Sequence, residues 1–384
     1  MDSARSLKGT SHQCSALIAA GIFALAGCAV GPVVELSPDE SLAYEPFRPA
    51  REIRILTLNI WSGLTYEGTF SFGEYPDDRE KRYEALVAGI RALSPDIVCL
   101  QEVNPLPARA ERLAADLDYE TIYQVSLGGI RCGPLGIPAN LREGQAILVK
   151  KPWTLSYLDR ARLAGGGIAT NWFCFHLGEI TQAILARTMV NGKPLYVYCL
   201  HLHSGTGDDP RLDEALEKMP EEARAVALAA IEEDVGRRRD EIASLMGFID
   251  ATLPRGMPAV LCGDFNASLD GGELDALLAS GAWIDTFALK NPGAQGATWD
   301  PAGNPVIVRA NEEPSGAEKE PEEPLQLLER LREGLSQRID GVLIRGNVPR
   351  ERVLESRVVF KPVSADDPGF VASDHYGVLT TLSW

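Results

Sequence analysis

Positive charge is scarce in this 384-residue sequence. Lysine and arginine together number 37, against 54 aspartates and glutamates, which gives a formal net charge of −17. A surface that follows a nucleic-acid backbone is normally basic, so this balance disfavours binding to extended DNA or RNA. A basic cleft on an otherwise acidic body is the one arrangement that the argument does not exclude.

Several other features are missing from the sequence. There is no Cys-x-x-Cys pair, which argues against a structural zinc site. No apolar stretch after residue 28 is long enough to span a bilayer, and no internal repeat indicates a solenoid. Hydrophobic residues make up 45% of the chain, which is enough to bury a sizeable core.

The first 28 residues have the pattern of an export signal. Arg5 and Lys8 precede an apolar core at residues 16–26 that is too short to cross a membrane. The ending Leu25-Ala26-Gly27-Cys28 resembles the bacterial lipobox, which implies that Cys28 is lipidated. We therefore expect export to the bacterial cell envelope and a lipid anchor in a membrane. An ordinary secretory signal and a chance apolar stretch are the alternatives.

The remaining chain is expected to form a tether followed by one α/β domain. Residues 29–50 contain four prolines among small and acidic residues, as is typical of a tether. Residues 51–384 mix strand and helix patterns without a break, which favours a single domain. The main expected strands are 53–60, 97–100, 146–149, 183–190, 195–200, 260–262, 339–345, 357–361 and 377–382. Helices are expected at 83–93, 108–117 and 273–279, with a long helix that includes Arg237-Arg238-Arg239 as a solvated turn and a surface loop at 309–323.

Five cysteines remain after Cys14 and Cys28. Three lie inside apolar strand-like runs and are expected to be buried thiols: Cys99, Cys199 and Cys262. Cys132 and Cys174 lie in loop-like sequence, and export would permit a disulfide between them.

Polar residues at the ends of the apolar strands, or within them, form the candidate site. Asp264 and Asn266 follow the apolar run 258–262 and would share one face, because strand side chains alternate with period two. In a layered α/β fold such strand ends meet at one rim, where ligands bind. The full set is Asn59, Glu102, His201, Asp264, Asn266, Asp340, Asp374 and His375. Each residue alone also fits a turn, a solvated position or a structural role, whereas the whole set points to chemistry.

Hydrolysis of a phosphate ester is the chemistry that fits this set. Glu102, Asn59 and Asp374 offer the oxygen ligands that a hard cation such as Mg²⁺ prefers. A carboxylate, or a histidine oriented by one, can deprotonate a water, and histidine and asparagine can stabilise the anionic transition state. Ser373 precedes Asp374-His375, but no Gly-x-Ser-x-Gly motif surrounds it, which disfavours a serine hydrolase.

Six motifs, in order along the chain, resemble those of the endonuclease/exonuclease/phosphatase superfamily. They are Leu58-Asn59, Leu100-Gln101-Glu102-Val103, His201-Leu202, Gly263-Asp264-Phe265-Asn266, Arg338-Ile339-Asp340 and Ser373-Asp374-His375. The superfamily includes DNase I-like nucleases, inositol polyphosphate phosphatases and neutral sphingomyelinases. The resemblance implies a four-layered α/β sandwich, in which two packed mixed sheets are flanked by helices and the site lies at one edge.

The resemblance also implies roles for the matching residues. Asn59, Glu102 and Asp374 would bind the metal, with Mg²⁺ expected and Mn²⁺ or Ca²⁺ as alternatives. Asp264 would activate the water, Asn266 would bind the scissile phosphate, and His201 would contact the phosphate or leaving group. Asp340 would hold His375, which is catalytic either as a base or as a ligand of a second metal.

The substrate remains open at this point. Thr298-Trp299-Asp300-Pro301 is similar to a segment of bacterial sphingomyelinase-like members, which favours a phosphodiester with a lipid head group. Trp172, Phe173 and Phe175 are expected either in the core or on an exposed edge that contacts a membrane. We expect a monomeric enzyme; a secreted DNase I-like endonuclease, an inositol polyphosphate-type phosphatase and a non-catalytic binding module are the alternatives.

Overall fold

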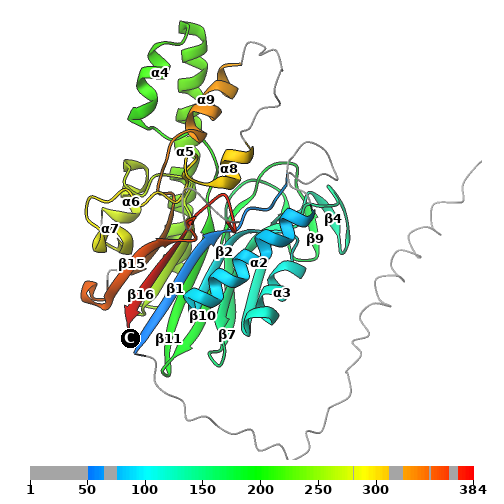
Figure 1. Ribbon diagram of the computed structural model, residues 1–384, viewed down its shortest axis with the longest axis vertical. Helices are drawn as coiled ribbons and strands as arrows, with labels where there is room; N and C mark the ends of the chain where they lie inside the picture. The colour runs from blue at the N-terminus through cyan, green and yellow to red at the C-terminus, as the bar shows by residue number, and fades with distance from the viewer. Residues whose placement is uncertain (1–50, 65–75, 280, 311–322, 346, 363–370) are drawn as a thin grey trace, which may run out of the picture. The chain divides into compact units, whose positions relative to one another are not determined.

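The computed structural model describes residues 51–64, 76–279, 281–310, 323–345, 347–362 and 371–384 (Figure 1). These residues lie in one compact unit, Pro49–Trp384. The expected signal segment, Cys28 and the expected tether lie outside the described residues. Among the helices described, none combines the length and the apolar character needed to cross a membrane.

Two six-stranded mixed sheets form the centre of the unit. The first has the order β15 (Val353–Val359), β16 (Gly377–Ser383), β1 (Glu52–Asn59), β2 (Ile97–Val103), β6 (Glu143–Lys150) and β3 (Tyr119–Leu127). The second has the order β13 (Trp283–Asp285), β14 (Asp340–Arg345), β12 (Ala259–Asp264), β11 (Lys193–His201), β10 (Thr181–Val190) and β7 (Leu155–Ala164). The pairs β1–β2 and β11–β12 are parallel, and the other pairs are antiparallel.

Alternating side chains sort these strands into an inner and an outer face. On β1, Ile53 and Ile55 pack between the two sheets, while Leu56 and Leu58 face outward. On β12, Val260 and Cys262 are inner residues. The three cysteines expected to be buried thiols, at positions 99, 199 and 262, are fully buried in this inner layer, as predicted.

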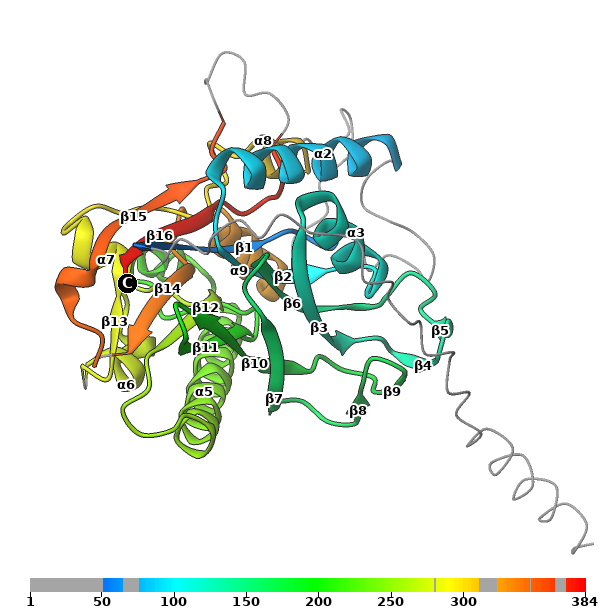
Figure 2. The same ribbon diagram turned by 90° about the horizontal axis from the view of Figure 1, so that it is seen from below.

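Helices cover the outer faces of both sheets, as Figure 2 shows from α2 through the two sheets to α5. The helices α2 (Pro76–Leu93) and α3 (Ala108–Leu117) pack on the first sheet. The second sheet is covered by α5 (Glu221–Thr252) and α6 (Asp275–Leu278). The predicted four-layered sandwich is confirmed. Shorter elements complete the described part: η1 (Pro210–Leu212), α4 (Asp213–Glu217), η2 (Gly272–Leu274), α7 (Thr286–Lys290), α8 (Pro305–Ala310), α9 (Pro324–Glu333) and η3 (Arg350–Arg352).

The long helix α5 carries an arginine that contradicts our expectation of a solvated turn. Arg238 is fully buried, and its Nε lies 2.8 Å from Glu273. Its guanidinium also donates to the carbonyl oxygens of Gly205 and Thr206. A buried charge needs such partners, so Arg238 joins α5 to the chain that follows β11. The expected loop at 309–323 lies for the most part outside the described residues, between α8 and α9.

A third, four-stranded sheet was not expected from the sequence. Its order is β5 (Leu135–Ile137), β4 (Ile130–Cys132), β9 (Phe173–Phe175) and β8 (Ile168–Ala169). Cys132 and Cys174 therefore lie in strands rather than loops, and both are free thiols. Cys132 pairs with Phe173, and Cys174 pairs with Arg131, so the two thiols point to opposite faces of the sheet. The disulfide prediction is wrong for this reason.

Candidate active site

The inner-face positions of four strands end in polar residues at the same edge of the sandwich. Asn59 continues the series of Ile53 and Ile55 on β1, and His201 continues that of Val197 and Cys199 on β11. In the same way Asp264 ends β12 and Asp340 begins the antiparallel strand β14. The register pairs His201 with Asp264 and Asp264 with Asp340. Side chains on a strand return to the same face at every second residue. The inner faces that pack in the core therefore also place these four polar side chains in one site.

Asn59 connects the two sheets at this edge. Its fully buried amide nitrogen donates to Glu102 Oε1 at 2.9 Å, in the first sheet, and to Asp264 Oδ2 at 3.0 Å, in the second. Its Oδ1 accepts from the backbone N–H of Trp61. In this arrangement Asn59 acts as a donor between two carboxylates, and its expected role as a metal ligand stays a prediction.

Glu102 reaches the site through a local irregularity in β2. The pairing of β2 with β6 shifts between Leu100 and Val103, and Glu102 has a φ of +54°. Bulges of this kind re-aim a side chain that regular alternation would place on the other face. The carboxylate then also accepts from the backbone N–H of Ser62 at 3.0 Å.

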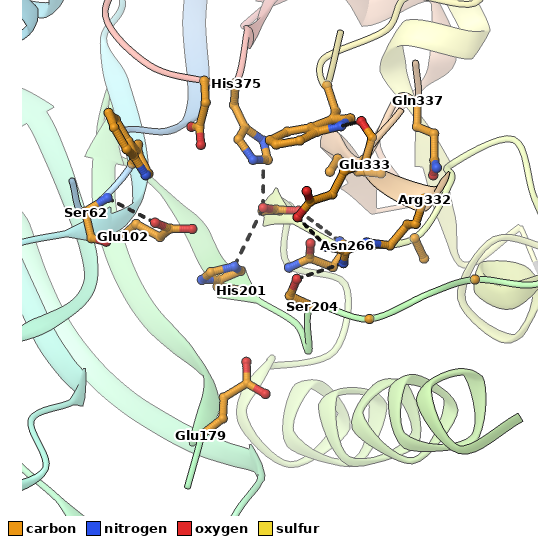
Figure 3. A pocket seen from close by; sticks show the side chains of 18 of the residues that line it. Ser62, Glu102, Glu179, His201, Ser204, Asn266, Arg332, Glu333, Gln337 and His375 are labelled. Atoms are coloured by element: carbon orange, nitrogen blue, oxygen red, sulfur yellow. Dashed lines mark hydrogen bonds and ion pairs between the residues drawn. The ribbon is translucent and has the colours of Figure 1, made fainter. Parts of the chain in front are cut away.

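Asp264 contacts both histidines of the site, His201 and His375, whose side chains point toward one another in Figure 3. Its Oδ2 lies 3.6 Å from Nε2 of His201 and 3.8 Å from Nδ1 of His375. Its Oδ1 accepts from the backbone N–H of Asn266. The preceding Gly263 makes this approach feasible, because a Cβ there would lie 2.3 Å from the carbonyl oxygen of Leu200. One carboxylate therefore contacts both histidines.

His375 is held by Asp340 and Trp299. Its Nδ1 lies 2.9 Å from Asp340 Oδ2, and the ring of Trp299 packs edge-on against it with centroids 5.2 Å apart. Burial alone would lower the pKa of His375, but Asp340 and Asp264 outweigh this and raise it well above its usual value. Ligand atoms of Asp264, Asp340 and His375 lie within 4.8 Å of one another, close enough to hold a cation. Both readings of His375, as base or as ligand, fit this geometry.

Asp374 faces the site beside Glu102. Burial raises its pKa, and repulsion from Glu102 adds to the effect, so that the pKa is about 6 despite the opposing charge of His375. The segment is held by Asn304, whose side chain donates to the carbonyl oxygens of Ser373 and Asp374. Two carboxylates that repel each other in a buried pocket offer the oxygen donors that a divalent cation prefers. This part of the site therefore fits the metal that the superfamily implies.

Asn266 and His201 supply donors next to Asp264. Asn266 has a φ of +48°, and its Nδ2 donates to the carbonyl oxygen of Leu202, which leaves one amide proton for a ligand. Burial alone would lower the pKa of His201, but Asp264 and Glu102 raise it. Both side chains line the same pocket as Glu102 and Asp374.

Glu143 is a site residue that we did not expect. It begins β6, lines the pocket and is 3% exposed. Burial and the nearby charge of Glu102 raise its pKa to about 8, and its Oε2 has no hydrogen-bond partner among the described residues. The apolar pattern predicts a strand from Ala146 only, whereas β6 begins three residues earlier, at Glu143.

The pocket has a volume of about 1040 Å³, much more than a phosphate group needs. Ten carboxylates line it, whereas Arg332 of α9 is the single lysine or arginine among the described lining residues. The guanidinium of Arg332 donates to Ser204 Oγ at 3.1 Å. The site is thus an acidic cavity with cationic groups at few positions, chiefly the two histidines at its centre.

His203 contacts three carboxylates beside the pocket. Its Nδ1 lies 2.6 Å from Glu179, which lines the pocket, and its Nε2 lies 2.9 Å from Asp234 on α5. Arg237 also binds Glu179, and Glu241 accepts from the backbone N–H of His203. Burial alone would lower the pKa of His203, but the hydrogen bonds to Asp234 and Glu179 raise it to about 9.

Replacement of His203 by Gln should lower the free energy of unfolding at pH 6 by about 1 kcal/mol, after allowance for solvent screening. The folded-state pKa lies above the usual 6.5, so the stabilisation is fully present below pH 6.5 and is lost as the pH rises through about 9. Urea unfolding of both proteins at pH 6, 7.5 and 9.5 measures this difference. A difference that stays constant with pH would show that the charge of His203 does not stabilise the fold.

The sequence profile of the Endonuclease/Exonuclease/phosphatase family matches residues 56–375. Among proteins of curated function, no sequence matches. A family protein from Bacteroides thetaiotaomicron has a similar structure, with a TM-score of 0.53 and 13% identity over 88% of this chain and 99% of that chain.

Two structures of TDP2 from D. rerio are also similar. A version humanized by 14 mutations has a TM-score of 0.51 and 14% identity, over 87% of this chain and 100% of that chain. The D. rerio protein in complex with a single-strand DNA product has a TM-score of 0.52 and 15% identity over the same shares. At these identities the structures show the fold alone. The family profile covers most of the chain, and the chain therefore belongs to the endonuclease/exonuclease/phosphatase family, a family of phosphoester hydrolases.

Proposed function

We propose that the protein is a metal-dependent phosphohydrolase, most simply a phosphodiesterase, that acts at a membrane of the bacterial cell envelope. The observation that carries the proposal is the position of Asp264 between two groups of side chains. Asn59 joins it to the carboxylate of Glu102, and His201 and His375 lie close to the same carboxylate oxygen, Oδ2. A binding module would not need this complete set of acid, base and metal-ligating groups.

Glu102 and Asp374 are the residues that would hold the divalent cation, with Mg²⁺ expected and Mn²⁺ or Ca²⁺ as alternatives. The chemistry that such an ion supplies is neutralisation of charge on a phosphoryl oxygen. The raised pKa of Asp374, near 6, supports this assignment, because burial and repulsion from Glu102 cause it, and a cation shared by both carboxylates would offset both effects.

The other residues provide proton transfer and charge stabilisation. Asp264 lines the pocket and could accept a proton from a water there, while the three nitrogen atoms within 3.8 Å of its Oδ2 orient the carboxylate. His201, whose pKa is raised, would donate to the phosphate or the leaving group. Asp340 keeps the Nδ1 of His375 engaged, which orients Nε2 towards the reacting group, and Asn266 offers an amide proton to the phosphate.

The acidic pocket distinguishes between the possible substrates. Extended nucleic acid would bring repeated phosphates against ten carboxylates and one arginine, which disfavours an endonuclease. A substrate with one phosphate and a neutral or cationic remainder avoids this repulsion. A lipid whose head group contains a single phosphodiester and is otherwise neutral or cationic avoids the repulsion. An inositol polyphosphate carries additional negative charge and does not.

Hydrolysis of several substrates by the purified protein tests this proposal. We expect turnover of a small phosphodiester or sphingomyelin in Mg²⁺, and loss of turnover in EDTA. Glu102→Gln, Asp264→Asn and His201→Gln should each lower kcat by about 10² to 10⁴, because each removes a group that acts in the transition state. Glu355→Gln, an exposed substitution on β15, is the matched control and should leave the rate unchanged.

The alternatives have different outcomes in this assay. DNA as the preferred substrate would indicate an endonuclease, and preference for inositol phosphates would indicate a phosphomonoesterase. Turnover that persists in EDTA or in the Glu102 variant contradicts the metal mechanism. If no substrate class is hydrolysed, a non-catalytic binding module becomes the better explanation.

The proposed location depends on Cys28. Cys28→Ser should move the protein from the membrane fraction to the soluble fraction of the cell envelope, because the lipid chains provide the anchor. Fractionation and mass spectrometry of the wild type should find an acylated N-terminal residue at position 28. An unmodified Cys28, or a variant that remains in the membrane fraction at wild-type levels, argues against a lipoprotein.

A further inference from the structure

The four-stranded sheet beside the pocket has an outer face made of large apolar side chains. Alternation along its short strands places these side chains outward and their neighbours inward. The outward-facing residues of the strands are Ile130, Cys132, Leu135, Ile137, Ile168, Phe173 and Phe175, which we call the apolar sheet face. Trp172 and Leu177, in the adjoining chain, are 65% and 92% exposed. The expected exposed edge at Trp172, Phe173 and Phe175 is therefore present, and it is part of a larger surface.

Exposed apolar side chains are more concentrated on this sheet than elsewhere among the described residues. The described residues include sixteen exposed large apolar side chains, and eight of them lie in residues 130–137 and 168–177. Residues 128–141 and 165–178 expose no charged side chain, although charged residues make up 24% of the chain. Contiguous apolar surface of this kind marks a site of interaction with a protein or a membrane.

Buried polar residues hold the sheet rigidly from its inner side. The guanidinium of Arg131, which is 4% exposed, donates to the carbonyl oxygens of Pro134, Pro138 and Leu141. The ring of His176 accepts from two successive backbone N–H groups at the start of β4. The fold therefore keeps its polar groups inside this sheet and presents the apolar ones, which is the reverse of an ordinary solvent-exposed sheet.

The apolar sheet face is continuous with the active-site pocket. Ile130 and Ile137 belong to the face and also line the pocket, as does the adjoining Leu177. Figure 2 shows β4, β5, β8 and β9 together at one side of the sandwich, next to the edge strands β3 and β7. Anything that covers the face consequently lies at the mouth of the pocket.

We propose that the apolar sheet face docks on the surface of a phospholipid bilayer and presents the pocket to lipid head groups. This inference rests on the proposed phosphohydrolase function and specifies its substrate as a phosphoester carried in a bilayer. Tryptophan and phenylalanine with leucine and isoleucine are the side chains that enter the boundary between head groups and acyl chains. The net charge of −17 means that docking depends on apolar contact rather than on attraction to anionic lipid.

The bilayer is a better occupant than a second protein. A protein interface has a polar rim, and these segments expose no charged side chain that would contribute to such a rim. The chain outside the structure also permits docking. The 22 residues from 29 to 50 can extend up to about 75 Å, so a lipid anchor at Cys28 leaves the unit free to turn this face towards the membrane.

A fluorescent probe on Cys132 tests the docking directly. Cys132 is exposed on the apolar sheet face, whereas the other four described cysteines are buried. In the full chain with Cys14→Ser and Cys28→Ser, an environment-sensitive thiol probe should therefore label Cys132 selectively. With phosphatidylcholine vesicles we expect a blue shift of its emission, and quenching by spin-labelled lipid that is insensitive to salt.

The matched control carries the probe on β15. In the same chain with Cys132→Ser and Leu354→Cys, the probe occupies an exposed apolar position away from this sheet and should show neither effect. Any attachment of residues 1–28 to the vesicles occurs in both proteins. A difference between the two probe responses therefore reports only docking of the apolar sheet face. A Cys132 probe that remains in water overturns the proposal.

Substitutions on the face provide the second comparison. Leu135→Glu with Trp172→Glu, which both lie outside the pocket, should weaken the Cys132 response at least tenfold. Val226→Glu with Leu228→Glu on α5 is the control, since these residues are 47% and 44% exposed and should have no effect. Both double variants should hydrolyse a soluble phosphodiester within twofold of the wild-type rate, while the face variant alone loses at least tenfold on lipid in vesicles.

The outcomes separate this proposal from the proposed function. If soluble phosphodiester is hydrolysed but the face variant behaves like its control on vesicles, docking is wrong and the hydrolase stands. If nothing is hydrolysed, the probe response still decides docking by itself. Concentration-dependent dimers in sedimentation that the face substitutions disrupt, without a vesicle response, would assign the face to a second copy of the chain and overturn the proposal.

Discussion

The side chain of Asn59 joins the two sheets at the point where the chemistry is located. Each proton of its amide is donated to a carboxylate, Glu102 in one sheet and Asp264 in the other. Without this connection the two acids would face each other across the sandwich with only repulsion between them. The remaining geometry follows, because Asp264 positioned in this way lies within reach of both His201 and His375.

The rest of the site depends on the same electrostatic constraint. A dense group of carboxylates is costly in a buried pocket, and the pKa values of Asp374 and Glu143 rise as a result. Against the opposing effect of burial, Asp264 and Glu102 raise the pKa of His201, and Asp340 and Asp264 raise that of His375, which favours the protonated forms. A cation between the carboxylates and an anionic phosphate beside the histidines would each relieve part of this strain. The acidic pocket therefore matches a metal-bound phosphate better than it matches either ligand alone.

Much of the fold and the centre of the site could be predicted from the sequence, because both follow from strand periodicity. Asn59, His201, Asp264 and Asp340 are continuations of inner-face positions, and a period of two is visible in the residues themselves. Glu102 lies where a bulge interrupts that period, so its direction depends on the pairing with β6. Glu143 was missed because its strand begins three residues before the apolar run.

Other features depend on partners distant in sequence and were not predictable in the same way. In the sequence, Arg238 stands between two other arginines, a pattern that predicts a solvated position. Its partner Glu273 is distant in the sequence and comes close only in the folded protein. The strands β4 and β9 have three residues each and lie in glycine-containing sequence, so no periodic pattern could develop. Their stability comes from the inward-facing Arg131 and His176, whose partners are backbone groups that the sequence does not distinguish.

A metal held by Glu102 and Asp374 is tested most directly by diffraction from crystals grown with Mn²⁺ and inorganic phosphate, measured at the manganese absorption edge. We expect an anomalous peak between Glu102 and Asp374, with a phosphate that contacts His201 or Asn266. A second peak at His375 would be compatible with this arrangement. Manganese bound only at Asp264, Asp340 and His375, or absent from the pocket while phosphate is present, would contradict it.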